Sequence, residues 1–359
     1  MLISLKECQR KYIRFMDKTI KIGLLCVLSL LLSLLCIGFG SIVIDSKWVF
    51  QIVANHLIGQ EYFSIDWERS FETIVWDLRV PRILLAFLTG ASLSLVGVIM
   101  QTITKNNLAE PYILGISSGA SAGAVAVIIL SSSYSVLQKL SIEQGAFLGS
   151  LLSIGMVFFI SSKQIIKGSS LILTGVGVSS FFSALTTLII YSSKNNSQLV
   201  TAMFWMTGSL SSAAWEDLSY PFFLFLFALG VVVLYSYEMD ILLMGDTNAN
   251  TLGVNTTFLK CMMIGISTLL ISVLVSLTGI IGFIGLVIPH ISRKLIGYQH
   301  KTLVLFSVFL GGSFLVLSDT FARTYFSPEE MPIGVITAFV GTPLFLWIVR
   351  KNYSYGGKE

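Results

Sequence analysis

The segment 115–119 reads GISSG and fits the pattern G-x-S-x-G, with Ser117 between two glycines. In hydrolases this pattern places a nucleophilic serine on a sharp turn between a strand and a helix. With His290 as a base, it would describe an intramembrane serine protease. The flanking residues, however, are apolar stretches typical of membrane helices, and a membrane helix rich in glycine and serine contains the pattern easily by chance. The protease is therefore kept only as an alternative.

Other catalytic chemistry has little support in the sequence. The chain has three histidines, His56, His290 and His300, and no metal-ligand spacing, so we expect neither a metal site nor a bound cofactor. It contains no G-x-x-x-x-G-K-[ST] phosphate loop. The middles of its apolar stretches contain no Asp, Glu, Lys or Arg, whereas ion-coupled carriers usually place ionisable groups there. If the chain drives uphill transport, ATP must therefore be hydrolysed on a separate ATPase subunit.

The composition is that of a polytopic membrane protein. Of 359 residues, 54% are hydrophobic and 12% are charged, against about 25% charged in soluble domains. Because each apolar stretch approaches the ~20 residues that cross a bilayer, we predict an all-α protein with ten transmembrane helices. The predicted spans are 20–44, 83–103, 113–131, 145–162, 169–192, 218–236, 258–277, 280–296, 302–318 and 333–350.

The distribution of Lys and Arg predicts the orientation in the cell membrane. The basic N-terminal tail 1–19 and the C-terminal tail 352–359 both fall in the cytoplasm, on either side of a single domain at 20–351. The acidic stretch 61–77 falls outside. The net charge of +4 follows from this loop asymmetry, and we expect no nucleic-acid partner. The first apolar stretch is too long for a signal peptide and is interpreted as an uncleaved helix.

Three arginines, Arg79, Arg82 and Arg323, break this trend because they lie on the outer side. They could simply reach toward lipid headgroups. A guanidinium also suits the recognition of a carboxylate on another protein.

From about residue 75 to its C-terminus, the chain resembles the permease subunits of the vitamin B12 and iron-siderophore ABC importer family. The matching segments, in family order, are RVPR (79–82), GASLSLVGVIMQ (90–101), NNLAEPYILGISSGA (106–120), WMTGSL (205–210), MGDTNANTLGV (244–254), LTGIIGFIGLVIPHISR (277–293), SDTFAR (318–323) and MPIGVITAFVGTPLFLWIVRK (331–351). The resemblance implies ten helices per subunit, a second permease subunit, two ATPase subunits and an extracytoplasmic binding protein.

The resemblance also implies roles for individual residues. Arg79, Arg82 and Arg323 would dock acidic residues of the binding protein. The segment 240–256 would couple to the ATPase, through Gly245, Asp246, Ala249, Leu252 and Gly253. Residues 249, 252 and 253 have helical spacing and are expected to share one face. Thr247 departs from the family, which usually has a second acidic residue there.

A cytoplasmic gate is implied at two places, formed by Asn106 and Leu108 and by Gly168 and Ser169. The family often has proline at the position of Asn107 and a hydroxyl residue at that of Gly168, so the gate can differ here. An iron chelate, either a ferric siderophore or heme, is the expected solute, with cobalamin as the alternative. A passive channel or scaffold, which would need no ATPase, is the alternative from another class.

Overall fold

Every regular element in the described residues is helical. The computed structural model describes residues 2–59, 62–161, 168–327 and 329–356. Its α-helices are α1 (Leu2–Gly38), α2 (Ser46–Ile58), α3 (Arg69–Glu72), α4 (Val80–Thr104), α5 (Ile116–Leu130), α6 (Ile142–Ser161), α7 (Gly168–Ser192), α8 (Asn196–Met206), α9 (Ser219–Leu234), α10 (Ser236–Leu242), α11 (Asp246–Thr251), α12 (Thr256–Thr278), α13 (Ile284–Ile296), α14 (His300–Tyr325) and α15 (Ile333–Gly356). A π-helical turn, η1 (Thr73–Arg79), leads into α4, and a 3-10 turn, η2 (Pro111–Leu114), leads into α5.

Each predicted span overlaps one of these helices, namely α1, α4, α5, α6, α7, α9, α12, α13, α14 and α15. Within the described residues, seven helices are long and apolar enough to cross a membrane. The apolar parts of α5 and α15 are shorter, at Ile116–Leu130 and Ile333–Trp347, and α13 has 13 residues. The all-α, multi-span class is thereby confirmed, while the number of ten crossings stays a prediction.

The first helix differs from its prediction at both ends. It begins at Leu2, so residues 2–19 of the predicted tail are helical. It ends at Gly38, before the predicted limit of 44. The Arg79 side chain binds the carbonyl oxygens of Ile37 and Gly38 at this end, and Asp45 caps the start of α2. The apolar residues 39–44 therefore form a turn between two helices.

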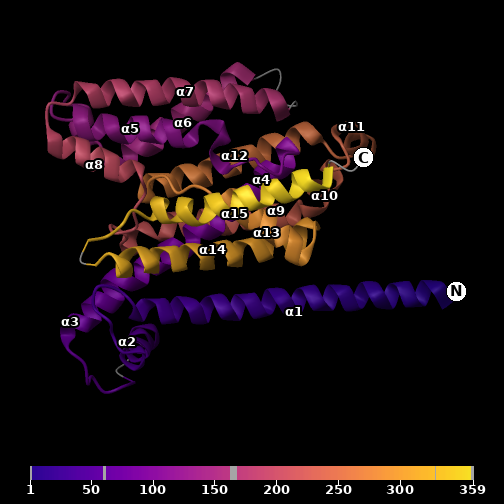
Figure 1. Cartoon of the computed structure of the whole chain (residues 1–359), viewed down its shortest axis with the longest axis horizontal. Helices are drawn as coiled ribbons and strands as arrows, with labels where there is room; N and C mark the ends of the chain where they lie inside the picture. Colours follow the sequence, from indigo (N-terminus) through magenta and orange to yellow (C-terminus); the bar gives the residue numbers. More distant parts are fainter. Residues whose placement is uncertain (1, 60–61, 162–167, 328, 357–359) are drawn as a thin grey trace.

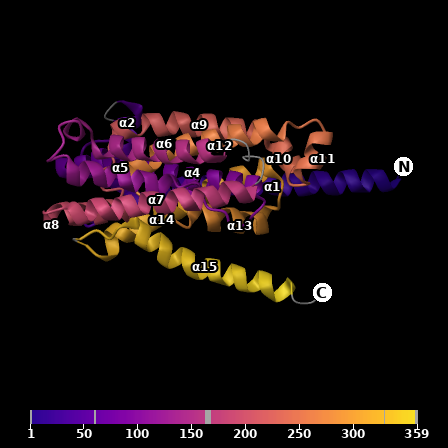
Figure 2. The same cartoon turned by 90° about the horizontal axis from the view of Figure 1, so that it is seen from above.

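The helices form a bundle with two distinct ends (Figure 1). The two ends of the chain lie at the same end of the bundle, together with α10 and α11. The opposite end carries α2, α3 and α8. Seen from above, α15 diverges from the other helices toward the C-terminus (Figure 2). Two chain ends on one side agree with the even number of crossings expected from the sequence.

Helix α4 lies at the centre of the bundle. In its most apolar 18-residue window, 89% of the residues are buried. It packs on α14 along much of its length and also contacts α13 and α12. Its largely apolar sequence therefore faces protein on most sides, as expected for a buried helix.

Small residues bring α5 and α6 into close contact, as their composition predicts. A Cβ added to Gly123 would lie 2.0 Å from the Gly145 carbonyl oxygen. A Cβ on Gly119 would lie 2.4 Å from that of Gly149. Only glycine permits this approach of two backbones, so the glycine-rich stretch 115–124 has a packing role.

Candidate functional site

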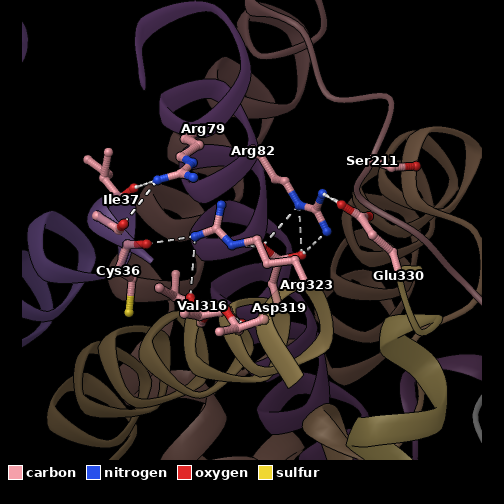
Figure 3. Close-up of polar contacts among 12 residues, drawn as sticks. Cys36, Ile37, Arg79, Arg82, Ser211, Val316, Asp319, Arg323 and Glu330 are labelled. Atoms are coloured by element: carbon pink, nitrogen blue, oxygen red, sulfur yellow. Dashed lines mark hydrogen bonds and ion pairs between the residues drawn. The ribbon is translucent and has the colours of Figure 1, made fainter. Parts of the chain in front are cut away.

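At the end of the bundle that carries α2, Arg82 binds two carboxylates of the same chain (Figure 3). Its Nε and Nη2 lie 2.9 and 2.8 Å from Asp319 Oδ1. Its Nη1 donates to Glu330 Oε1 at 2.8 Å. Asp319 is fully buried, whereas the Glu330 side chain is 33% exposed. The Arg82 guanidinium thus links α4 to α14 through Asp319 and to the loop before α15 through Glu330. All three of its nitrogens donate hydrogen bonds.

Arg79 and Arg323 fix the end of α1 beside this pair (Figure 3). Arg79 Nη1 donates to the carbonyl oxygens of Ile37 and Gly38 at 2.9 and 3.0 Å. Arg323 Nη2 donates to the Cys36 carbonyl oxygen at 2.7 Å. Helices leave their last four carbonyls without intrahelical partners, and the two arginines donate hydrogen bonds to three of these carbonyls in α1. Arg79 and Arg323 are 6% and 4% exposed.

The three arginines that the sequence singles out are therefore brought together, but inside the protein. Headgroup contact is the wrong interpretation, because the guanidinium groups are buried among α1, α4 and α14. Docking of a binding protein stays a prediction. In this arrangement a carboxylate of a partner would reach Arg82 by replacing Glu330, the exposed member of the network. Sequence reasoning missed the two carboxylates that bind Arg82, namely Asp319, inside the SDTFAR segment, and Glu330, directly before the segment that starts at Met331.

At the other end of the bundle, α11 is a separate short helix between two glycines with positive φ. Gly245 has φ 108° and Gly253 has φ 87°, a region that glycine enters without steric cost. The helix ends at Thr251, so Leu252 and Gly253 lie beyond it. Ala249 is fully buried, while Leu252 is 61% exposed. The expectation that residues 249, 252 and 253 share one face is wrong, because the helix is too short to include them all.

Asp246, at the start of α11, binds two lysines that the sequence did not single out. Its Oδ1 accepts from Lys105 Nζ at 2.8 Å and its Oδ2 from Lys260 Nζ at 2.5 Å. Burial acts to raise the pKa of the Asp246 carboxyl, but the hydrogen bonds and charges of both lysines outweigh it and lower the pKa below its ordinary value. Asp246 therefore stays ionised at neutral pH and points into the chain.

The first predicted gate segment follows directly on α4. The helix ends at Thr104, and the next residue, Lys105, has φ 51°, a left-handed conformation. The Asn106 side chain accepts a hydrogen bond from the Leu108 N–H at 2.9 Å. Leu108 is 43% exposed. Gly168 begins α7, and the side chain of Ser169 lies outside the described residues. Both gate segments therefore stay predictions.

Beyond Leu108 the chain turns back into the bundle and is fixed to the break between α12 and α13. Glu110 Oε1 accepts from the Phe283 N–H at 3.0 Å. The Tyr112 hydroxyl donates to the Ile281 carbonyl oxygen at 3.1 Å. Such interrupted helices are tolerated in membranes where other groups satisfy the freed backbone. Glu110 and Tyr112 were missed because their partners lie about 170 residues away in the sequence.

The protease geometry is not assembled. In the described part of the chain, no hydrogen bond joins Ser117 to His290, and the Nε2 of His290 has no partner. Ser117 belongs to the first turn of α5, which follows a 3-10 turn. The strand that a nucleophile elbow requires is therefore replaced by a helical turn.

Residues 25–351 match the FecCD transport family. The chain belongs to the FecCD transport family. The chain is similar to the hemin transport system permease protein of Yersinia pestis, with 35% identity over 80% of this chain and 87% of the relative. The Fe(3+)-citrate import system permease protein YfmD of Bacillus subtilis is 35% identical over 85% of this chain and 92% of the relative. The cobalamin import system permease protein of Halobacterium salinarum is 35% identical over 78% of this chain and 74% of the relative.

A solved structure agrees with this assignment. The inward-facing conformation of a transporter assigned to the metal-chelate type of ABC transporter has 30% sequence identity and a TM-score of 0.78. The match covers 92% of this chain and 98% of that one. As a FecCD member, the protein is the membrane permease subunit of an ABC importer and not an enzyme.

Proposed function

We propose that the protein imports an iron chelate, a ferric siderophore or heme, as a ten-span permease in the cell membrane. A second permease subunit, identical or paralogous, would complete the path. Two ATPase subunits would bind the end that carries α11 and both chain ends, which is then the cytoplasmic end. An extracytoplasmic binding protein would deliver the chelate to the opposite end. ATP would bind only to the ATPase subunits, with no cofactor on this chain.

The observation that carries this proposal is the α11 segment. It is a short, independently hinged helix at the surface of the bundle end, with the exposed Leu252 just beyond it. A passive channel would need no such element. Its position next to the gate segment at Lys105 gives a route from ATP hydrolysis to the path.

Relatives of this chain named for hemin and Fe(3+)-citrate favour an iron chelate as the solute. Cobalamin is the second candidate, because one relative of equal identity is named for cobalamin import. Large solutes of this kind do not need a tight side-chain site in the permease. Selection among them would then be made by the binding protein.

The test is uptake by vesicles that contain the permease, its ATPase and its binding protein. Labelled ferric siderophore, heme and cobalamin are followed in separate assays, with and without internal ATP. We expect ATP-dependent uptake of one iron chelate that survives a proton uncoupler. Uptake without ATP, or loss of uptake with the uncoupler at constant ATP, would refute the mechanism. Uptake of cobalamin alone would support ATP-driven import but refute the proposal that the solute is an iron chelate.

A further inference from the structure

Asp246 joins three parts of the chain that are separate in sequence. One carboxylate oxygen binds Lys105, at the end of α4, and the other binds Lys260, in the first turns of α12. Asp246 itself begins α11. In the described part of the chain, the other side-chain hydrogen bonds of α11 stay within residues 244–256. Lys105 is thus the contact through which α11 reaches the gate segment.

The two halves of this cluster differ in burial. The Lys260 side chain is 2% exposed, whereas that of Lys105 is 38% exposed. A buried ammonium requires its carboxylate partner, so Asp246 stays attached to α12. An exposed ion pair is weak and screened by salt, so the Lys105 contact can form and break. The cluster therefore has one permanent and one reversible contact.

The surroundings allow a movement of α11 to reach the gate. The positive-φ glycines Gly245 and Gly253 bound α11, and a Cβ on Gly253 would meet no atom within 4 Å. The short helix α11 is therefore flanked on both sides by glycines whose backbone conformation other residues rarely adopt. On the gate side, Lys105 precedes Asn106 and Leu108 directly, and the segment is anchored again at Glu110. A displacement of Lys105 would therefore move the few residues between Lys105 and Glu110, which include Asn106 and Leu108.

We propose that the cluster Lys105–Asp246–Lys260 is the mechanical link that transmits movement of α11 to the gate segment 105–110. Lys105 and Lys260 are positioning residues, because they act through Asp246 and touch neither ATP nor solute. The inference rests on the proposed function, since it assumes that α11 receives movement from the ATPase.

The test measures ATP hydrolysed per chelate transported, in the reconstituted complex with labelled ferric siderophore or with heme, whichever the wild type takes up. Lys105→Met removes the reversible contact and leaves the Asp246–Lys260 pair in place. We expect the ratio to rise by roughly threefold to tenfold, with unchanged assembly and basal ATP hydrolysis. Lys105→Arg keeps the charge and should restore the ratio.

Lys301→Met is the matched control. Lys301 is an exposed lysine at the start of α14, and among the described residues it has no ion pair. The same substitution there should leave the ratio unchanged. Equal effects of both variants would overturn the link, because loss of a cytoplasmic positive charge would then suffice.

A second measurement separates a link from two independent roles. In a link, Asp246→Asn and Lys105→Met break the same contact, so the double variant should be no worse than Asp246→Asn alone. The proposal would be overturned if the double variant raised the ratio of ATP hydrolysed per chelate by the product of the two single effects. Because Asp246→Asn also leaves the buried Lys260 without its carboxylate, thermal stability is recorded for every variant. A wild type without ATP-dependent uptake would refute the proposed function itself, whereas an active wild type with an unchanged ratio in Lys105→Met refutes only the link.

Discussion

Each end of the bundle holds a cluster of three charged side chains, but in opposite surroundings: Arg82 binds Asp319 and Glu330 at one end, and Asp246 binds Lys105 and Lys260 at the other. At one end Arg82 and Asp319 are 11% and 1% exposed. At the other, Lys105 and Asp246 are 38% and 28% exposed. Breaking a buried pair costs about 3–5 kcal/mol, whereas an exposed pair contributes about 0.2–1 kcal/mol. The first therefore fixes the fold, and the second can change partners during a transport cycle.

The largest effect is expected at the buried end. Arg82→Met leaves Asp319 without its forked partner and should lower the free energy of unfolding by about 3–5 kcal/mol. Thermal unfolding of the solubilised protein measures this. The double variant Arg82→Met/Asp319→Asn removes both charges and should be more stable than Arg82→Met. Equal stability of Arg82→Met and the wild type would show that the Arg82–Asp319 pair does not stabilise the fold.

Next in size is a change at the hinge of α11. Gly253→Trp forces a bulky side chain into a positive-φ conformation, which costs about 1–3 kcal/mol, and it faces outward, where the ATPase is expected. We expect loss of most stimulated ATP hydrolysis while the binding protein still docks. Gly253→Asn is the control, because asparagine tolerates a left-handed backbone. Normal hydrolysis in the tryptophan variant would place the coupling surface elsewhere.

A smaller effect concerns pH, at Glu110. Burial raises the pKa of the Glu110 carboxyl, and the hydrogen bond from the Phe283 N–H opposes this only partly. The folded state then holds a proton that the unfolded state releases, so stability should fall as pH rises from the ordinary carboxyl pKa through the raised one. Unfolding temperatures of wild type and Glu110→Gln across this window test it. The Gln variant should lack that slope, and identical profiles would contradict the prediction.

The smallest effect is expected from Glu330→Gln, which tests the docking role. If a carboxylate of the binding protein takes the place of Glu330 on Arg82, removing this competitor should tighten docking by roughly twofold to fivefold. Arg82 keeps its pair with Asp319 in this variant, so the fold is preserved. Binding-protein affinity measured on the solubilised complex decides the matter. Weaker docking would mean that Glu330 itself contacts the partner.

The sequence predicts features that depend on neighbouring residues, but not contacts between residues that are distant in sequence. Span positions follow from local composition, so each predicted span has a helix. The residues 79, 82 and 323 stood out because positive charge outside breaks a local rule. Their burial could not be predicted, since the partners Cys36 and Asp319 come from segments that are distant in sequence. Lys105 and Lys260 gave no local signal at all, because lysines at helix ends are common.

The burial of α4 has a consequence for how the protein is made. In the finished fold most of this helix is buried, yet its most apolar 18-residue window has a mean hydropathy of 2.3, against 1.8 for that of α14. Its neighbours α13 and α14 are synthesised only after residue 283, roughly 10 to 40 s later at ordinary rates of translation. During that interval the nascent helix has lipid where its partners will be. We infer that the high apolarity of α4 serves its insertion by the translocon, a stage of biogenesis that the mature structure no longer displays.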